Sequence, residues 1–274
     1  MNKPPADAVL RAFGAGEEPV LLSGGTGAGT FRAGNLVLKR VSRTDEAEWS
    51  SAVLRDLDAP GVCVPPPVLS RDGRWVVDGW QASEFVEGSH AGPNGGRWKE
   101  TIVACRAFHA GLAMVPRPAF LVQRDDAWSE ADRLAFAERE QTPLPEFAGA
   151  LGRLARVLAP VEARDQVIHG DFTGNVLFAE GQPPCVIDFS PYWRPVEFAL
   201  AIVISDALSW SSADPAIIGL CADVPDFAQW LARATFRRIW EIDCHARRGW
   251  PNPEQHLRGY LPTIGLIEQL CSRK

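Results

Sequence analysis

The amino-acid sequence predicts an α+β protein, with strands in its first third and helices in most of the remainder. Before residue 88, short runs of β-branched and aromatic residues alternate with glycine and proline turns. After residue 96, apolar residues recur every three or four positions, as they do in amphipathic helices. Separate strand-rich and helix-rich parts are typical of the α+β class. A Gly/Pro/Asn-rich stretch lies between them, so we expect two lobes that cover 1–88 and 89–274.

The first part has the pattern of a small sheet with two helices. The expected strands are bounded by glycine or proline, and they cover 19–23, 31–40 with a break at Gly34-Asn35, 75–77 and 81–86. The expected helices have apolar residues at helical spacing, and they cover 5–14 and 46–57. The glycine-rich segment 24–29 joins the first strand to the second, so we expect a turn there.

The second part combines amphipathic helices with short buried strands. The helices have one apolar face, and they cover 102–115, 147–158 behind Pro145, and 227–242. Proline fits this place because the first turn of a helix does not use its backbone N–H. The strands are brief β-branched or apolar runs at 167–168, 176–178 and 186–187.

Composition and charge favour an ordinary cytoplasmic protein. The chain has 274 residues, of which 46% are hydrophobic and 23% charged, and its net charge is −6 without a basic cluster. Nucleic acid is therefore an unexpected partner. Six scattered cysteines without a Cys-x-x-Cys pair indicate reduced thiols. The N-terminus has no apolar signal core, and the longest apolar run, 198–204, is too short to cross a bilayer, so no membrane contact is expected.

Hard oxygen ligands follow the short strands of the second part. Asp171, Asn175 and Asp188 would lie on turns at the ends of those strands, next to a dry core. Carboxylate and amide oxygens suit Mg²⁺ bound to substrate phosphates. They suit zinc poorly, because no Cys/His cluster is near them.

Two motifs resemble those of a known family. His169-Gly170-Asp171 with Asn175, followed by Ile187-Asp188-Phe189, resembles the catalytic and metal-binding pair of aminoglycoside phosphotransferases and choline-kinase-like enzymes. The resemblance runs roughly from 20 to 210 and is strongest to an actinobacterial branch of that superfamily. It implies a bilobal protein-kinase-like fold, with a nucleotide-binding N-lobe and a catalytic and substrate-binding C-lobe. It also implies ATP or GTP with Mg²⁺ as cofactors and a small-molecule acceptor.

The resemblance assigns roles to the motif residues. Asp171 would be catalytic and would orient the acceptor hydroxyl or amine, while Asn175 and Asp188 would bind the metal ion. His169 is expected to pack and hydrogen-bond behind the loop. The family usually has its Asn five positions after the catalytic Asp, whereas here Asn175 stands four positions after Asp171. We expect Thr173-Gly174 to form a tight turn that still lets Asn175 reach the metal ion.

The glycine-rich segment of the N-lobe is expected to contact nucleotide phosphates. A Walker A loop is excluded because no Gly-Lys-Ser/Thr follows, and a dinucleotide-binding fingerprint is excluded because a strand follows instead of a helix. A plain hairpin turn is the alternative. With the motifs downstream, phosphate contact is favoured, through the small residues Gly25, Thr26, Gly27 and Gly29.

Other nucleotide contacts are expected along the N-lobe. Lys39 lies inside an apolar strand pattern, and its ammonium group needs a partner there. By resemblance the partners are phosphate and a helix glutamate. Glu46 and Glu48 are candidates for the glutamate, and Glu48 is assigned to the predicted site. The backbone from Glu84 to Val86 would meet the adenine edge. Arg194 either holds a phosphate or pairs with Glu197 or another carboxylate.

The leading functional hypothesis is an ATP- or GTP-dependent phosphotransferase for a small-molecule hydroxyl or amine. The alternative is a catalytically impaired pseudokinase that binds nucleotide or a protein partner, which the shortened loop and an altered segment after Asp188 favour. A third hypothesis is transfer of a nucleotidyl group on the same fold. The acceptor and the oligomeric state are not predicted.

Overall fold

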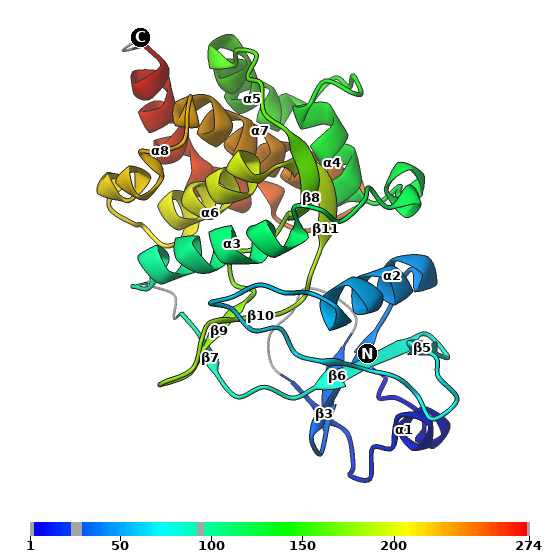
Figure 1. The fold of residues 1–274 in the computed structure, drawn as a ribbon. Coiled ribbons are helices and arrows are strands. Elements are labelled where there is room, and N and C mark those ends of the chain that lie inside the picture. Colours follow the sequence, from blue (N-terminus) through cyan, green and yellow to red (C-terminus); the bar gives the residue numbers. More distant parts are fainter. Residues whose placement is uncertain (1–2, 23–28, 92–95, 273–274) are drawn as a thin grey trace.

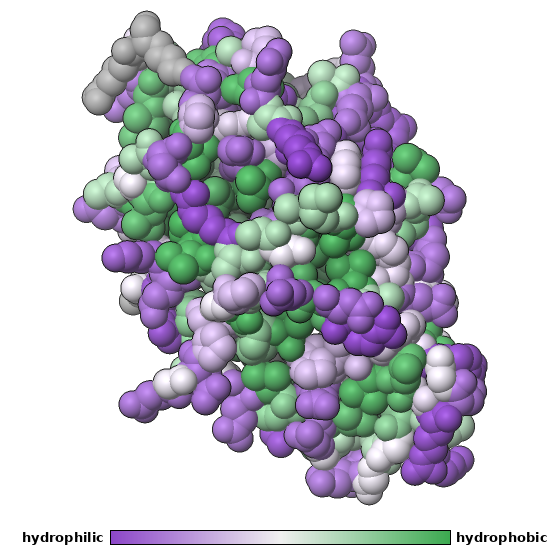
Figure 2. Space-filling model, in the orientation of Figure 1, coloured by the Kyte–Doolittle hydropathy of each residue, from purple (hydrophilic) through white to green (hydrophobic). Residues whose placement is uncertain are grey.

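The computed structural model describes residues 3–22, 29–91 and 96–272, which fold into a small N-lobe with an antiparallel sheet and a larger helical C-lobe. Figure 1 shows the N-lobe in blue and cyan below the helices of the C-lobe. On the face drawn in Figure 2, hydrophilic side chains are spread over both lobes, and hydrophobic side chains are visible among the hydrophilic ones. Two lobes of this kind confirm the α+β layout that the sequence predicts.

The N-lobe sheet has the strand order β1-β2-β3-β6-β4, and β5 pairs with β6. Its strands are β1 (Val20–Leu21), β2 (Thr30–Ala33), β3 (Leu36–Arg40), β4 (Pro67–Val68), β5 (Val76–Val77) and β6 (Trp80–Glu84). The predicted hairpin at Gly34-Asn35 joins β2 to β3, with Thr30 opposite Lys39. The predicted turn at 24–29 falls mostly outside the described residues.

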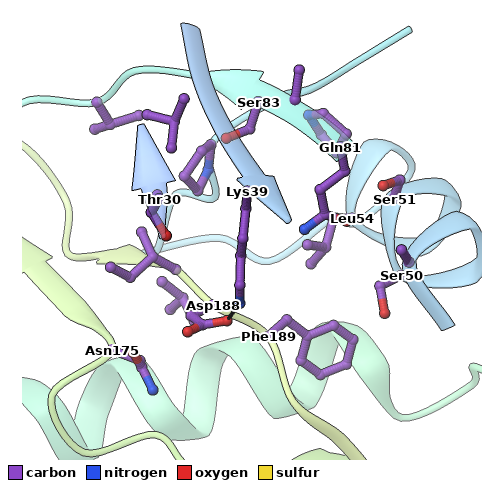
Figure 3. A pocket seen from close by; sticks show the side chains of 18 of the residues that line it. Thr30, Lys39, Ser50, Ser51, Leu54, Gln81, Ser83, Asn175, Asp188 and Phe189 are labelled. Atoms are coloured by element: carbon purple, nitrogen blue, oxygen red, sulfur yellow. Dashed lines mark hydrogen bonds and ion pairs between the residues drawn. The ribbon is translucent and has the colours of Figure 1, made fainter. Parts of the chain in front are cut away.

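The two helices of the N-lobe are α1 (Asp7–Phe13) and α2 (Thr44–Arg55). Apolar side chains of α1 pack with Phe31, Leu38 and Trp80 in the N-lobe core. Because side chains alternate along a strand, burial of Leu38 on this face turns Lys39 to the other face of β3. Lys39 therefore faces the cleft toward the C-lobe, where it is seen in Figure 3.

The C-lobe is built from six α-helices and two short 3-10 helices in the described residues. They are α3 (Trp98–Leu112), η1 (Ala119–Gln123), α4 (Ala127–Ala135), α5 (Pro145–Val157), α6 (Val196–Trp210), η2 (Pro215–Cys221), α7 (Phe227–Ala246) and α8 (Pro253–Ser272). The apolar run 198–204 lies wholly inside α6 and is fully buried in the C-lobe core. Within the described ranges, every helix is too short or too polar to cross a bilayer.

Two short sheets at the base of the C-lobe position the motif residues. In one, β8 (Asp165–His169) pairs antiparallel with β11 (Pro191–Pro195). In the other, β9 (Val176–Phe178) lies between β10 (Cys185–Val186) and β7 (Ser89–His90). The chain therefore joins a C-lobe sheet directly after Gly88, although the lobe boundary at 88/89 stays a prediction. The strand ends bring residues 169–175 and 187–190 together, as the spacing of the apolar runs predicts.

Candidate active site

A cleft of about 780 Å³ lies between the lobes. Its N-lobe wall comes from β3, β6 and α2, and its C-lobe wall from the segments around β9 and β10. The polar side chains that line it include Glu46. They also include Lys39, Ser50, Ser51, Gln81, Asn175 and Asp188, which are labelled in Figure 3. The predicted C-lobe metal ligands and the predicted N-lobe lysine thus face one cavity.

Lys39 and Asp188 form an ion pair that bridges the two lobes, drawn as a dashed line in Figure 3. Asp188 follows β10 and has a φ of +50°, a left-handed conformation that aspartate tolerates better than most residues. The side chains are 36% and 45% exposed, so solvent and ligands can reach both. An exposed pair of this kind contributes little to stability and can open to admit phosphate on one side and a cation on the other.

The shortened loop forms the expected tight turn. The N–H of Asn175 donates to the carbonyl of Phe172 at 3.1 Å, and Gly174 has a φ of +79°. This pattern closes a four-residue turn whose third residue needs positive φ, a place suited to glycine. The Nδ2 of Asn175 donates to the backbone oxygen of Asp171 at 2.6 Å. Because the nitrogen faces Asp171, the amide oxygen of Asn175 is left for the cleft that it shares with Asp188.

These oxygen donors fit a magnesium ion. Asp188 supplies carboxylate oxygens and Asn175 an amide oxygen, both hard ligands of the kind that Mg²⁺ prefers. No cluster of three or more His, Cys, Asp or Glu side chains that could enclose a metal ion occurs in the described ranges. An ion at this site would therefore complete its shell with water and phosphate oxygens, as is usual for Mg²⁺.

Asp171 is held by an arginine that the sequence did not single out. Nη2 of Arg238, on α7, donates to Oδ1 of Asp171 at 2.8 Å, and the same guanidinium binds Asp206 and Glu241. Burial opposes ionisation of Asp171, but the charge and the hydrogen bond of Arg238, with smaller contributions from His169 and Arg237, together lower the pKa of the carboxyl. The Asp171 side chain is 49% exposed, so its carboxylate stays ionised, oriented and open to a ligand.

The backbone around Asp171 rests on two buried histidines. The N–H of Asp171 donates to Nδ1 of His169 at 3.2 Å, and the N–H of His169 donates to Nε2 of His109 at 2.9 Å. Burial lowers the pKa of both rings, and that of His109 falls to about 3. Both are therefore neutral and act as supports, which confirms the structural role expected for His169. His109, on α3, was not predicted.

Gly170 allows close packing behind the loop that carries Asp171. A Cβ atom at this position would lie 2.3 Å from Cδ2 of Tyr192 on β11. The glycine of the His-Gly-Asp motif is thus required by the aromatic ring against it, and a side chain there would push Asp171 out of place.

The structure separates the two candidate glutamates of α2. Glu46 lines the cleft, where burial raises the pKa of its carboxyl against the opposing effect of Arg124, 3.8 Å away. Glu48 is exposed and is not among the described residues that line the cleft. Two residues along a helix rotate a side chain by about 200°, which turns Glu48 away when Glu46 faces inward. In this structure Lys39 contacts Asp188, and Glu46 contacts Arg124.

The end of β6 and the two residues after it lie at the edge of the cleft as expected. Glu84, Phe85 and Val86 all line it. The N–H groups of Glu84 and Phe85 already donate to the carbonyls of Pro66 and Asn35, at 2.9 and 2.8 Å.

Gly29 is described and buried, whereas Gly25, Thr26 and Gly27 lie outside the described residues.

Arg194 does not face the cleft. It is buried between Asp132 on α4 and Glu138, with nitrogen–oxygen distances of 2.7 and 2.6 Å. Of the two interpretations, the carboxylate pair is correct and the phosphate contact is wrong. Its partners differ from Glu197 because the fold brings Asp132 and Glu138, which lie 62 and 56 residues away in the sequence, to Arg194, and spacing along the chain does not reveal this.

Comparisons with known proteins agree with this geometry. The family of phosphotransferase enzymes matches residues 10–207. A search among curated proteins finds no match. Among solved structures, spectinomycin phosphotransferase APH(9)-Ia in complex with ADP and spectinomycin is similar, with 15% identity, a TM-score of 0.58 and 97% of each chain covered.

Two further solved structures share the fold. Aminoglycoside phosphotransferase APH(4)-Ia has 14% identity and a TM-score of 0.61, with 96% of each chain covered. A choline/ethanolamine kinase family protein from Mesorhizobium loti has 15% identity and a TM-score of 0.56, with 93% of this chain and 89% of that chain covered. These likenesses show the bilobal kinase-like fold along nearly the whole chain.

Proposed function

The chain belongs to the phosphotransferase enzyme family, and from that premise we propose that it transfers the terminal phosphoryl group of ATP or GTP to a small-molecule hydroxyl or amine. The observation that carries the proposal is the convergence of Lys39, Asn175 and Asp188 on one cleft, with ionised Asp171 four residues before Asn175. Phosphoryl transfer depends mainly on positioning and charge neutralisation, and these groups supply both.

Each residue has a distinct part in the proposed reaction. Lys39 leaves Asp188 and neutralises phosphate oxygens from the N-lobe side. Asp188 and Asn175 hold Mg²⁺, which when bound supplies positive charge at the phosphate oxygens. Asp171 accepts a hydrogen bond from the acceptor hydroxyl and directs its oxygen toward the phosphorus. Because Arg238 lowers the pKa of Asp171, this carboxylate is a weak base that orients the hydroxyl and accepts its proton late.

Further nucleotide contacts are proposed for residues of the N-lobe. Gly25, Thr26, Gly27 and Gly29 are proposed to lay backbone N–H groups over the phosphates. The backbone at Glu84 and Val86 is proposed to meet the purine edge. Glu46, which lines the cleft, is a better candidate than Glu48 for the acidic partner of Lys39 once Asp188 is engaged by metal.

A nucleotide-binding pseudokinase is the second candidate. It is favoured by the pairing of Asp171 with Arg238, because this ion pair occupies one oxygen of the carboxylate that would orient an acceptor. Among the described residues, the other oxygen, Oδ2, has only a long contact of 3.4 Å with Asn175, and for this reason we place the active enzyme first.

The test is phosphoryl transfer from γ-labelled ATP and GTP to a panel of metabolite alcohols and amines, with product masses measured. The expected result is a phosphorylated product with wild-type protein and none with Asp171→Asn. Nucleotide binding without any transfer would support the pseudokinase instead. Label from the α position appearing in the product would show nucleotidyl transfer and refute the proposed reaction.

A further inference from the structure

Two cysteines from different lobes stand opposite each other on paired backbones. Cys63 lies on the segment between α2 and β4 of the N-lobe, and Cys185 begins β10 of the C-lobe (Figure 1). The N–H of Cys63 donates to the carbonyl of Pro184 at 2.9 Å, and the N–H of Val186 donates to the carbonyl of Cys63 at 2.8 Å. These bonds form an isolated parallel bridge between Cys63 and Cys185. The bridge places one thiol from each lobe at the same point of contact.

The bridge meets the geometric requirement for a disulfide bond. Paired strands lie about 4.8 Å apart, and the side chains of directly opposite residues leave the backbone on the same side. Disulfides usually join residues whose Cα atoms are roughly 4.4–6.8 Å apart. Burial, followed by a side-chain hydrogen bond with Cys63, raises the pKa of the Cys185 thiol. Both side chains are reduced thiols in the structure, so the pair is a dithiol that is ready to be oxidised.

The segment that carries Cys63 is seated on the C-lobe at a second point. The backbone of Gly111, on α3, packs so closely against it that a Cβ atom there would lie 2.7 Å from the carbonyl oxygen of Asp58. Contacts at residues 58 and 63 therefore hold this segment against the C-lobe. Because the fold already keeps the two thiols together, little chain entropy is lost when they are joined.

A cavity of about 340 Å³ gives small molecules access to Cys63. It lies between the end of α2 and the segment that carries Cys63, and its lining includes Leu54 and Arg55 of α2 and Cys63 itself. Cys63 is half-buried, whereas Cys185 is only 2% exposed. A small oxidant therefore reaches Cys63 first, and Cys185 reacts with the product formed there.

The bridge lies on the strand that leads to the proposed metal site. Asp188 follows Cys185 by three residues, and the N–H of Ile187 donates to the carbonyl of Asn175 at 2.9 Å. A disulfide has an S–S bond of about 2.05 Å, which is shorter than the contact between two unbonded sulfur atoms. Bond formation therefore pulls β10 toward the N-lobe segment and displaces Asp188. Groups that support metal ligands change metal affinity about 10–100-fold when they are disturbed.

We propose that Cys63 and Cys185 form a redox modification site, at which hydrogen peroxide joins the two lobes through a disulfide and thereby weakens Mg²⁺-dependent nucleotide binding. The cross-link is independent of the proposed function, whereas its effect on nucleotide binding rests on that function.

The reaction has two steps. The sulfur of Cys63 attacks one peroxide oxygen, the O–O bond breaks, and Cys63 becomes a sulfenic acid while the other oxygen leaves as water with the thiol proton. The sulfur of Cys185 then attacks the Cys63 sulfur, the S–O bond breaks, and a second water carries away the proton of Cys185. Two thiols are oxidised to one disulfide, and one peroxide is reduced to two waters.

Peptide mapping of the full chain tests the cross-link. Reduced protein is treated with hydrogen peroxide, the remaining thiols are alkylated, and the digested peptides are identified by mass. We expect the peptides of Cys63 and Cys185 to become linked with loss of two hydrogen atoms, and dithiothreitol to separate them. The proposal is overturned if Cys63 stays reduced, ends as an unlinked sulfinic acid, or links to another cysteine instead.

Variants and denaturant show whether the native contact makes the link. Cys63→Ser should remove it, whereas Cys271→Ser, which changes a half-buried thiol near the end of α8, is the matched control and should leave it in place. Three thiols of the C-lobe core are at most 1% exposed and should stay reduced in wild type: Cys105, Cys221 and Cys244. In urea the preference for the Cys63–Cys185 pair should disappear. A link that forms equally well in urea would refute the role of the fold.

Nucleotide affinity tests the consequence for the metal site. Calorimetry measures binding of a non-hydrolysable ATP analogue with and without Mg²⁺, before and after oxidation. Oxidation of wild type should weaken the Mg²⁺-dependent affinity about tenfold, and dithiothreitol should restore it. Oxidised Cys63→Ser should bind as tightly as reduced wild type.

The outcomes separate this inference from the proposed function. Equal affinity in reduced and cross-linked wild type would overturn the effect of the disulfide on the site. Absence of nucleotide binding in reduced wild type would overturn the proposed function and that effect together, while the cross-link would still be decided by peptide mass.

Discussion

The two sides of Asp171 are built in opposite ways. On the nucleotide side, Lys39 and Asp188 are half-exposed and paired across the lobes, so incoming charge can separate them. On the acceptor side, Arg238 is buried with Asp206 and Glu241, and this cluster keeps one arrangement. The Lys39–Asp188 pair, which is proposed to open for ligand, lies in solvent, whereas the pairs of Arg238 with Asp206 and Glu241 are removed from it. The comparison predicts a large loss of catalysis on substitution of Asp171, a large loss of stability on substitution of Arg238 and a small loss of stability on substitution of Lys39.

The largest effect is expected at Asp171, where the two sides meet. Asp171→Asn keeps the shape of the side chain but removes the charge that orients the acceptor. We expect kcat to fall by about 10²–10⁴, the usual contribution of such a group. Steady-state kinetics with any acceptor found in the panel provides the measurement, and nucleotide stabilisation is the control. A variant with near-normal kcat would show that Asp171 is not the orienting group.

The acceptor side should be sensitive to loss of its arginine. Arg238→Met leaves Asp206 and Glu241 buried without their shared partner, so we expect the free energy of unfolding to fall by about 3–5 kcal/mol. Urea denaturation measures it. Arg106→Met is the matched control, because Arg106 and Asp223 are 36% and 67% exposed and such pairs contribute about 0–1 kcal/mol. If Arg238→Met and Arg106→Met lose similar amounts of unfolding free energy, the proposed difference between buried and exposed ion pairs is wrong.

The nucleotide side should respond in binding rather than in stability. Lys39→Ala removes an exposed pair, so we expect the unfolding free energy to change by less than about 1 kcal/mol. The stabilisation by Mg-nucleotide should drop sharply in the same variant. Lys99→Ala, which changes an exposed lysine of α3 that is not among the residues lining the cleft, serves as the control. If Lys39→Ala unfolds the protein and leaves residual binding unchanged, the lysine is structural.

A last expected effect is a pH dependence of stability from the buried histidine behind the loop. The folded-state pKa of His109 is lowered to about 3, whereas the unfolded state has an ordinary value near 6.5. Below pH ~6.5 the unfolded chain binds a proton at His109 that the folded chain does not bind. The free energy of unfolding therefore decreases as the pH is lowered, by up to about 1.4 kcal/mol per pH unit. Denaturation at pH 7.5 and 5.5 measures the slope. His109→Gln should reduce it; an unchanged slope would assign the acid sensitivity to other groups.

The fold and the motif pair could be predicted because local pattern carries them. Strand runs ending at Asp171 and Asp188 showed that both residues lie on turns, and the hairpin at Gly34-Asn35 placed Lys39 on a strand. By contrast, α6 was missed because a helix that is buried on every side has no apolar period. The helix α8 and the short strand β11 were missed as well, and only contacts with distant segments explain where they lie.

The support of the site could not be predicted from spacing along the chain. Arg238 stands next to Arg237 on an amphipathic helix, where neighbouring arginines usually indicate a solvated face. Only packing of α6 against α7 brings Asp206 to it. The choice between Glu46 and Glu48 likewise depended on which face of α2 is turned toward the cleft. The rotation of the helix about its axis decides this, and the sequence does not give that rotation. Both cases concern side chains whose partners come from elements far apart in the sequence.

The most direct test of the account is thermal unfolding with ATP or GTP, with and without Mg²⁺, in wild type and Asp188→Ala. At ~100 times the dissociation constant, ligand should stabilise wild type by about 2.7 kcal/mol. The account predicts a shift that needs Mg²⁺ for its full size in wild type and loses that Mg²⁺ component in Asp188→Ala. No shift with either nucleotide at millimolar concentration, with or without Mg²⁺, would contradict both the kinase and the nucleotide-binding pseudokinase.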